Sequence, residues 1–180
     1  MKSMTIVKKR IFLITLPLLL SLCLVSPALY PFIWHLRYGN RIVFNGAEAE
    51  VPRGWVAVPR EAHSLTFIKY PVLVFGLRDA TSGFTLGPAP TNASRDPEEL
   101  YKSWISVNWS MWNGRDSVVK GPFMFTSGEK EIACMTSFPN TGSDGMASCL
   151  LFQRTWLAQF TGNENDVESF FEVIRKAVKK

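Results

Sequence analysis

An uninterrupted apolar run near the start of the chain limits what this sequence can fold into more than any other feature. A basic stretch leads into Ile11–Trp34, 24 residues without Asp, Glu, Lys or Arg. A helix needs about 20 apolar residues to cross the hydrocarbon core of a bilayer, so this run is long enough to span one. The sequence therefore predicts a basic cytoplasmic tail over residues 1–10, a transmembrane anchor or signal peptide over residues 11–34, and one domain over residues 35–180.

The same run also has features of a cleavable signal peptide. Such a peptide has an apolar region of roughly 7–15 residues, followed by small residues at the cleavage site. Ile11–Val25 meets that length, and small side chains follow at Ser26 and Ala28. Apolar residues continue as far as Trp34, which together with Tyr30 would fall at an interfacial aromatic belt. We expect an uncleaved anchor, with cleavage near Ala28 as the alternative.

Charges around the run predict its orientation. Four basic residues precede it, and two, Arg37 and Arg41, follow closely. The more basic flank stays in the cytoplasm, so we expect a single-pass protein of the inner (cytoplasmic) membrane with its domain outside. If the alternative cleavage occurs, the domain is secreted or periplasmic.

The charge of the exported part excludes one class of partner. Residues 11–180 carry 16 basic and 15 acidic residues, a net charge of +1. Nucleic-acid binding requires a clustered basic surface, and no such cluster interleaved with aromatic residues occurs in the domain. We therefore expect no nucleic-acid partner.

Short apolar segments between turn residues indicate many strands. Asn45-Gly46 is typical of a tight hairpin, because a type I′ turn needs positive φ at both central residues. The hairpin would join strands over residues 41–45 and 47–51. Alternation and turn signals predict further strands over residues 55–58, 65–70, 72–77, 83–86, 122–126, 130–138, 145–153 and 156–160.

Two helices carry clear end signals. Asp96 and Pro97 can begin a helix that ends near Gly114. A second amphipathic pattern covers residues 164–178, with Asn165 as its expected cap. This order of elements predicts an α+β fold, in which one antiparallel sheet carries both helices on one face.

Cys134 and Cys149 lie in two strands that are expected to pair. If Phe138 faces Met146, the cysteines are one residue from direct opposition, so a bridge would need a bulge or register shift. An oxidising compartment would favour that disulfide, whereas two buried thiols are the alternative. Two sulfurs without a nearby histidine do not make a zinc site, and we expect neither a metal nor another cofactor.

Residues suited to catalysis are few. The chain has two histidines, His35 beside the apolar run and His63 in a predicted loop. A serine with His63 would suit a small envelope hydrolase, yet the sequence has no Gly-x-Ser-x-Gly elbow. The sequence therefore favours a non-catalytic role, with a hydrolase using His63 as the alternative.

Three tryptophans near the first predicted helix are the candidate binding residues: Trp104, Trp109 and Trp112. They would form an aromatic patch for a sugar, a peptide or a partner protein, or else pack on the sheet. Helical spacing favours packing, with Trp109 the most exposed of the three. We expect an envelope binding or scaffolding module whose partners are the membrane, through residues 11–34, and another envelope protein. An anchor that is itself the interacting element is a further possibility.

The chain resembles the PsbP-like domain group in two short motifs. One is Val-Pro-Arg-Gly-Trp at residues 51–55, and the other is Phe-Thr-Gly at residues 160–162, before a Phe-rich terminal helix. The resemblance covers residues 41–178. It implies an α-β-α or α+β sandwich that is usually non-enzymatic and lumenal or envelope-located. It carries over no functional residue, because the matched positions are structural.

Overall fold

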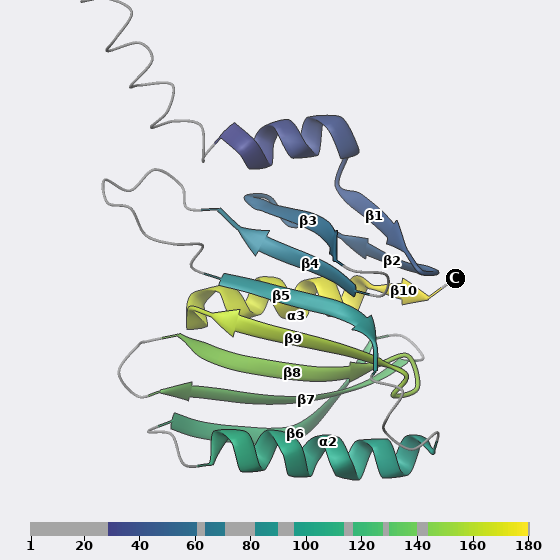
Figure 1. Ribbon diagram of the computed structural model, residues 1–180, viewed down its shortest axis with the longest axis vertical. Coiled ribbons are helices and arrows are strands. Elements are labelled where there is room, and N and C mark those ends of the chain that lie inside the picture. The colour runs from purple at the N-terminus through teal and green to yellow at the C-terminus, as the bar shows by residue number, and fades with distance from the viewer. Residues whose placement is uncertain are drawn as a thin grey trace, which may run out of the picture.

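A seven-stranded antiparallel sheet forms the centre of the computed structural model, in the order β3-β4-β5-β9-β8-β7-β6 (Figure 1). The structure describes residues 29–60, 64–70, 82–89, 96–113, 117–127, 130–139 and 144–179. The strands are β3 (Trp55–Arg60), β4 (Ser64–Lys69), β5 (Ser82–Pro88), β6 (Ser117–Ser127), β7 (Lys130–Pro139), β8 (Gly145–Leu151) and β9 (Trp156–Gly162). The predicted α+β class is confirmed.

A second, three-stranded sheet has the order β1-β2-β10. Its strands are β1 (Arg41–Phe44), β2 (Ala47–Glu50) and β10 (Val178–Lys179). Asn45 and Gly46 join β1 to β2 with φ values of 48° and 76°. The predicted hairpin is confirmed, since both central residues adopt the positive φ that a type I′ turn requires.

The helices α2 (Pro97–Trp112) and α3 (Val167–Lys176) lie on opposite faces of the large sheet (Figure 1). The prediction that both would cover one face is wrong. Side chains alternate along a strand, so β7 and β8 offer apolar residues to both sides. Ala133 and Leu150 pack with α2, whereas their neighbours Ile132 and Cys149 belong to the core on the α3 side.

Aromatic side chains dominate the core on the α3 side. Phe84 on β5 has its ring centroid 4.2 Å from that of Phe67 on the neighbouring strand β4 and 5.3 Å from that of Phe170 on α3. Phe160 also contacts Phe170, at 5.5 Å. These contacts hold α3 against β4, β5 and β9.

The C-terminal helix is shorter than predicted. A 3-10 turn, η2 (Glu164–Asp166), precedes α3, and its cap is Asn163 rather than the predicted Asn165. At the other end Ala177 is extended, and the chain continues into β10, which pairs Val178 with Glu48. Pairing with β2 therefore ends the helix before residue 178.

Residues 29–38 form a helix that packs against the rest of the domain through one side. Pro31 and Trp34 are buried there, and the Trp34 ring lies 5.3 Å from the Tyr38 ring. His35 Nε2 lies 3.1 Å from the Pro52 carbonyl oxygen, which ties the helix to the loop before β3. Trp34 thus belongs to the domain core, whereas the sequence suggested an interfacial position.

No helix within the described ranges combines the length and apolarity needed to cross a bilayer. Residues 1–28, with most of the expected anchor, lie outside those ranges, as do the expected strand over residues 72–77 and Gly114.

Candidate binding groove

A groove of about 520 Å³ lies between the start of α3 and the edge of the large sheet. Its walls come from β6, β7, η2 and α3, and most of its lining is apolar. The lining residues are Val118, Lys120, Phe123, Thr136, Phe138, Pro139, Glu164, Val167 and Phe171. The groove is open to solvent along β6, where Val118 and Phe123 are exposed.

A break in the register of β6 gives the groove its apolar wall. Val118 and Lys120 pair with β7 in one register, and Phe123 resumes pairing after an irregularity. Gly121 and Pro122 stand opposite the single residue Met135, so β6 has one extra residue here. Gly121 has φ 111°, and a Cβ added to it would lie 2.7 Å from the Cys134 carbonyl oxygen. A bulge of this kind changes which side chains face a given side, so Phe123 comes to line the same groove as Val118.

Aromatic contacts connect the groove to the core. The Phe171 ring lies 6.2 Å from that of Phe123 and 5.3 Å from that of Phe170. Lys120 and Glu164 add one charge of each sign, and neither has an ion-pair partner among the described residues. The groove therefore offers an apolar floor with a cation and an anion at its walls.

The three candidate tryptophans do not share one surface. Trp104 and Trp112 are buried between α2 and the sheet, and Trp104 Nε1 donates to Ser148 Oγ at 2.8 Å. These two residues pack on the sheet, the alternative that their helical spacing favours. Trp109 is exposed on α2, as predicted, and a binding role for it stays a prediction.

Cys134 and Cys149 form the predicted disulfide, and they are direct partners in the β7–β8 register. The predicted register is wrong by one residue, because Ser137 pairs with Met146. Directly opposed residues share a face of the sheet. Met146 packs with the α2 cluster and Phe138 with the α3 core, so these two cannot face each other. The bridge consequently needs no bulge.

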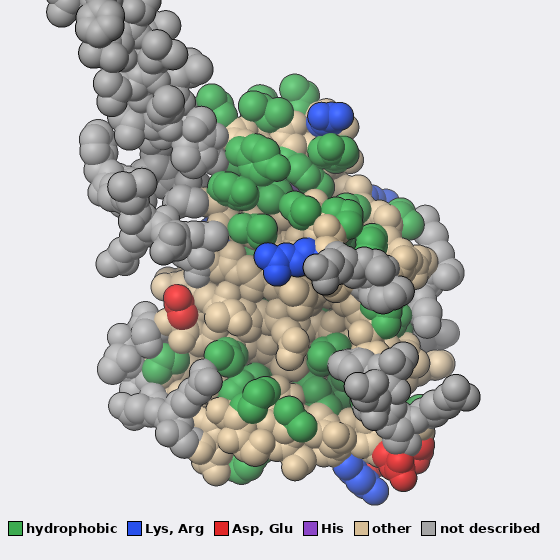
Figure 2. Space-filling view, in the orientation of Figure 1, with side chains coloured by type: hydrophobic (Ala, Val, Ile, Leu, Met, Phe, Trp, Pro, Cys, Tyr) green, Lys and Arg blue, Asp and Glu red, His purple; other side chains and the backbone are tan. Residues whose placement is uncertain are grey.

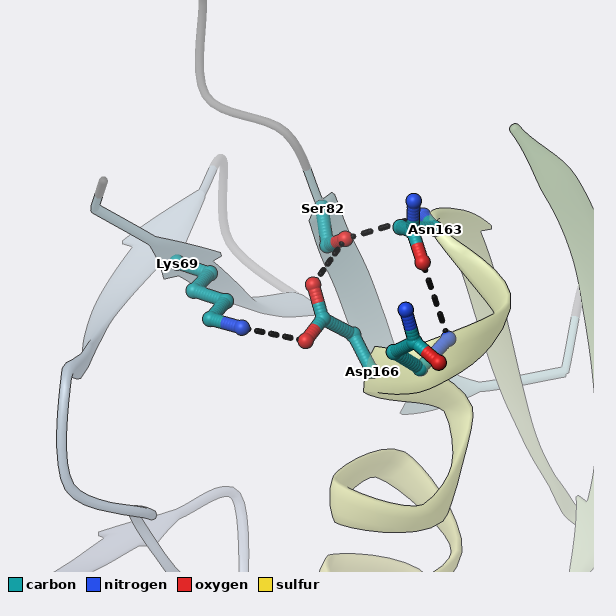
Figure 3. A network of polar contacts seen from close by, with 5 residues as sticks. Lys69, Ser82, Asn163 and Asp166 are labelled. Atoms are coloured by element: carbon teal, nitrogen blue, oxygen red, sulfur yellow. Dashed lines mark hydrogen bonds and ion pairs between the residues drawn. The ribbon is translucent and has the colours of Figure 1, made fainter. Parts of the chain in front are cut away.

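A polar network lies where α3 begins (Figure 3). Asp166 accepts hydrogen bonds from Lys69 Nζ and, at 2.6 Å, from Ser82 Oγ. Ser82 Oγ itself accepts from the Asn163 backbone N–H at 3.1 Å. Ser82 and Asp166 are buried, and the serine hydroxyl is committed to Asp166. The network joins the start of α3 to β4, to β5 and to the turn that follows β9.

The remaining candidates for chemistry give no site in the described residues. His63, on which the hydrolase alternative depends, lies outside the described ranges. Within those ranges, no group of three or more His, Cys, Asp or Glu side chains is arranged to hold a metal ion. The groove beside β6 is therefore taken as the candidate site in the described part of the chain.

Comparisons with known proteins show a similarity of fold only. No family model and no curated protein matches this sequence. The Ran-binding protein Mog1p of Saccharomyces cerevisiae is 9% identical over 77% of this chain and 94% of that chain, with a TM-score of 0.49. A Bacteroides thetaiotaomicron protein is 15% identical over 78% of this chain and 48% of that chain, with a TM-score of 0.47.

The cyanobacterial PsbP of Synechocystis sp. PCC 6803 is 13% identical over 78% of this chain and 91% of that chain, with a TM-score of 0.44. The resemblance to the PsbP-like group is thus present as a resemblance of fold, without support at the level of sequence.

The sequence did not point to the groove residues. Val118, Lys120 and Phe138 come from strands that pair at the edge of the sheet, and Glu164 and Val167 come from the last helical segment. The one available signal was Gly121-Pro122 inside an apolar segment, because glycine or proline within a strand often marks a bulge.

Proposed function

We propose that this chain is a membrane-anchored, extracytoplasmic binding module of the cell envelope, without catalytic activity. Its groove beside β6 would receive an apolar side chain from an extended segment of another envelope protein. The observation that carries this proposal is the position of the groove next to the edge strand of the large sheet.

Size and lining of the groove support a binding role. Ligand sites commonly have volumes of about 300–1,000 Å³ and apolar walls with a few polar groups. The groove falls within that range, with Lys120 and Glu164 as its charged groups. One charge of each sign does not select a strongly acidic or basic ligand, which favours an apolar occupant.

The edge strand supports a peptide-like occupant. In the described part of the chain, no strand pairs with the outer side of β6. Extended segments bind such edges through main-chain hydrogen bonds, and pockets beside the strand then select side chains. Residues 117–120, before the bulge, border the groove and offer backbone groups for this pairing.

Location outside the membrane is supported by two observations. The apolar run after a basic N-terminal stretch has the length and flanking charge of an anchor with its C-terminal side exported. The Cys134–Cys149 disulfide suits an oxidising compartment, because cytosolic thiols are usually kept reduced.

Site-specific photocrosslinking in native membranes tests the groove. Benzoylphenylalanine replaces Val118 in the groove or, as the matched control, Met124 on the other face of the same strand. The two positions are equally accessible, with exposed fractions of 44% and 48%. We expect position 118 to give an adduct with one envelope protein, at an apolar residue located by mass spectrometry, and position 124 to give none.

A second variant connects the adduct to the chemistry of the groove. Phe123→Ser removes part of the apolar wall and is expected to weaken the adduct formed at position 118. Equal adducts from positions 118 and 124, or none from either, would contradict the groove proposal. An adduct formed instead by benzoylphenylalanine at position 109 would move the binding site to Trp109.

A further inference from the structure

The helix over residues 29–38 carries an apolar stripe on the side that faces away from the domain. Leu29, Phe32, Ile33 and Leu36 follow the i, i+3, i+4, i+7 spacing of one helical face. Their exposed fractions are 43%, 66%, 55% and 78%. Figure 2 shows hydrophobic side chains gathered at this end of the molecule. A surface helix normally directs its apolar face toward the core. This stripe faces outward, so its apolar side chains can be removed from water only by an apolar environment outside the domain.

The other side of the helix is held by the domain. Trp34 is 6% exposed within the core, and the Tyr30 ring lies 5.0 Å from the Tyr70 ring. His35 adds its contact with the Pro52 carbonyl oxygen. Because these contacts set the rotation of the helix, the stripe cannot turn inward without breaking them.

A lipid bilayer is the apolar environment that the sequence places beside this stripe. Ile11–Ala28 is an apolar run of 18 residues that directly precedes Leu29. As a helix it would extend about 27 Å, close to the hydrocarbon thickness of about 30 Å. A chain that crosses the membrane through these residues emerges at the headgroups as the stripe begins.

Charge near the stripe suits a surface of anionic phospholipid. Arg37 is exposed on the flank of the helix, Arg41 follows in β1, and the first acidic residue of the chain is Glu48. Arg41 is partly engaged by Glu48, at 3.5 Å. An arginine beside an apolar surface can lay its stem along the acyl boundary and direct its guanidinium to phosphate.

We propose that the helix over residues 29–38 lies along the membrane surface, with the apolar stripe in the boundary between headgroups and acyl chains. This inference rests on the membrane anchoring in the proposed function, and it adds a fixed orientation to that anchoring. In Figure 1 this helix and β6 lie at opposite ends of the long axis. The groove beside β6 is then presented at the end of the domain away from the lipid.

Spin-label accessibility in the full chain tests the orientation. The Cys23→Ser chain carries a nitroxide at Ile33→Cys or, as control, at Met111→Cys on α2, positions with exposed fractions of 55% and 49%. Each chain is placed singly in a nanodisc that contains anionic phospholipid. We expect the label at position 33 to collide several-fold less often with a water-soluble nickel chelate than the label at position 111, and more often with oxygen.

The outcomes separate this inference from the anchoring on which it rests. Equal nickel accessibility at the two positions, in chains that remain in the discs, overturns the helix orientation and leaves the anchor standing. Chains that fail to enter the discs overturn both. Shielding that is absent in single-chain discs, and appears only when vesicles hold several copies, assigns the stripe to a second copy and also overturns the inference.

Discussion

Asp166 joins the start of α3 to the sheet through one carboxylate. One oxygen accepts from Lys69 at the end of β4, and the other accepts from Ser82 at the start of β5. A buried carboxylate loses its hydration, and hydrogen-bond donors at both oxygens offset that loss. The residue therefore stabilises the packing of α3, which forms one wall of the candidate groove.

Replacing Asp166 by alanine is expected to lower the free energy of unfolding by about 1–3 kcal/mol, because Ser82 and Lys69 lose their acceptor. Denaturant unfolding of the detergent-solubilised chain measures this loss. Glu168→Ala is the matched control, since Glu168 pairs with Arg175 at 2.9 Å on the surface of the same helix. An exposed pair contributes about 0–1 kcal/mol. Equal losses in the two variants would contradict a structural role for the network.

Single residues were predictable where local geometry decides their role. Asn45-Gly46 predicts the hairpin because the two positive φ values are a property of the turn itself. The partners of Asp166 were not predictable, because Lys69 and Ser82 lie 97 and 84 residues away along the chain.

At the scale of elements, the disulfide joins neighbouring strands of the central sheet. Cys134 on β7 and Cys149 on β8 have Cα atoms 4.2 Å apart. Their pairing places the bridge in the core on the α3 side, where both cysteines are fully buried. The strands were predicted from alternation, but their register depended on which face each apolar residue buries.

Removal of the disulfide is expected to cost about 3 kcal/mol of stability, since the bridge closes a loop of this size in the unfolded chain. The loop joins residues that are 15 apart in the sequence. Denaturant unfolding with and without reductant measures the effect, and mass spectrometry verifies reduction. The double variant Cys134→Ala and Cys149→Ala is the control, because its midpoint should not respond to reductant. An unchanged midpoint in the fully reduced natural chain would contradict the expectation.

For the helices, the start of α2 was predictable from the sequence, whereas the face that α2 covers and the end of α3 were not. Asp96 caps α2 by accepting from the Glu98 backbone N–H at 3.1 Å, as its position before Pro97 indicates. The face that α2 covers is a matter of tertiary packing, because β7 and β8 have apolar side chains on both sides. The end of α3 is likewise decided by pairing of Val178 with β2.

At the scale of the whole molecule, the helix over residues 29–38 is part of the folded domain. Trp34 packs in the same core as α3 and the small sheet. The sequence predicts a domain over residues 35–180, because the apolar run continues to Trp34 without a visible break. Apolarity alone does not distinguish a side chain that enters lipid from one that enters a protein core.

Trp34→Ala is expected to lower the free energy of unfolding of the domain by about 3–5 kcal/mol, as for other buried aromatic residues. Phe32→Ala, two residues earlier on the exposed side, should change it by no more than about 0.5 kcal/mol. Denaturant unfolding of the detergent-solubilised chain, followed by near-UV circular dichroism, compares the two. A domain that truly begins at residue 35 would unfold at the same midpoint in both variants.

The sequence by itself determined the apolar run, the hairpin at Asn45-Gly46, the first helix and most of the strands, because each depends on residues close together in the chain. Tertiary structure alone decided that the helices lie on opposite faces, that the two cysteines are directly opposed, and that Trp34 enters the core. It also decided the groove, whose walls come from segments on either side of residues 140–163. Such contacts depend on which distant surfaces bury each other, and a local pattern does not encode that choice.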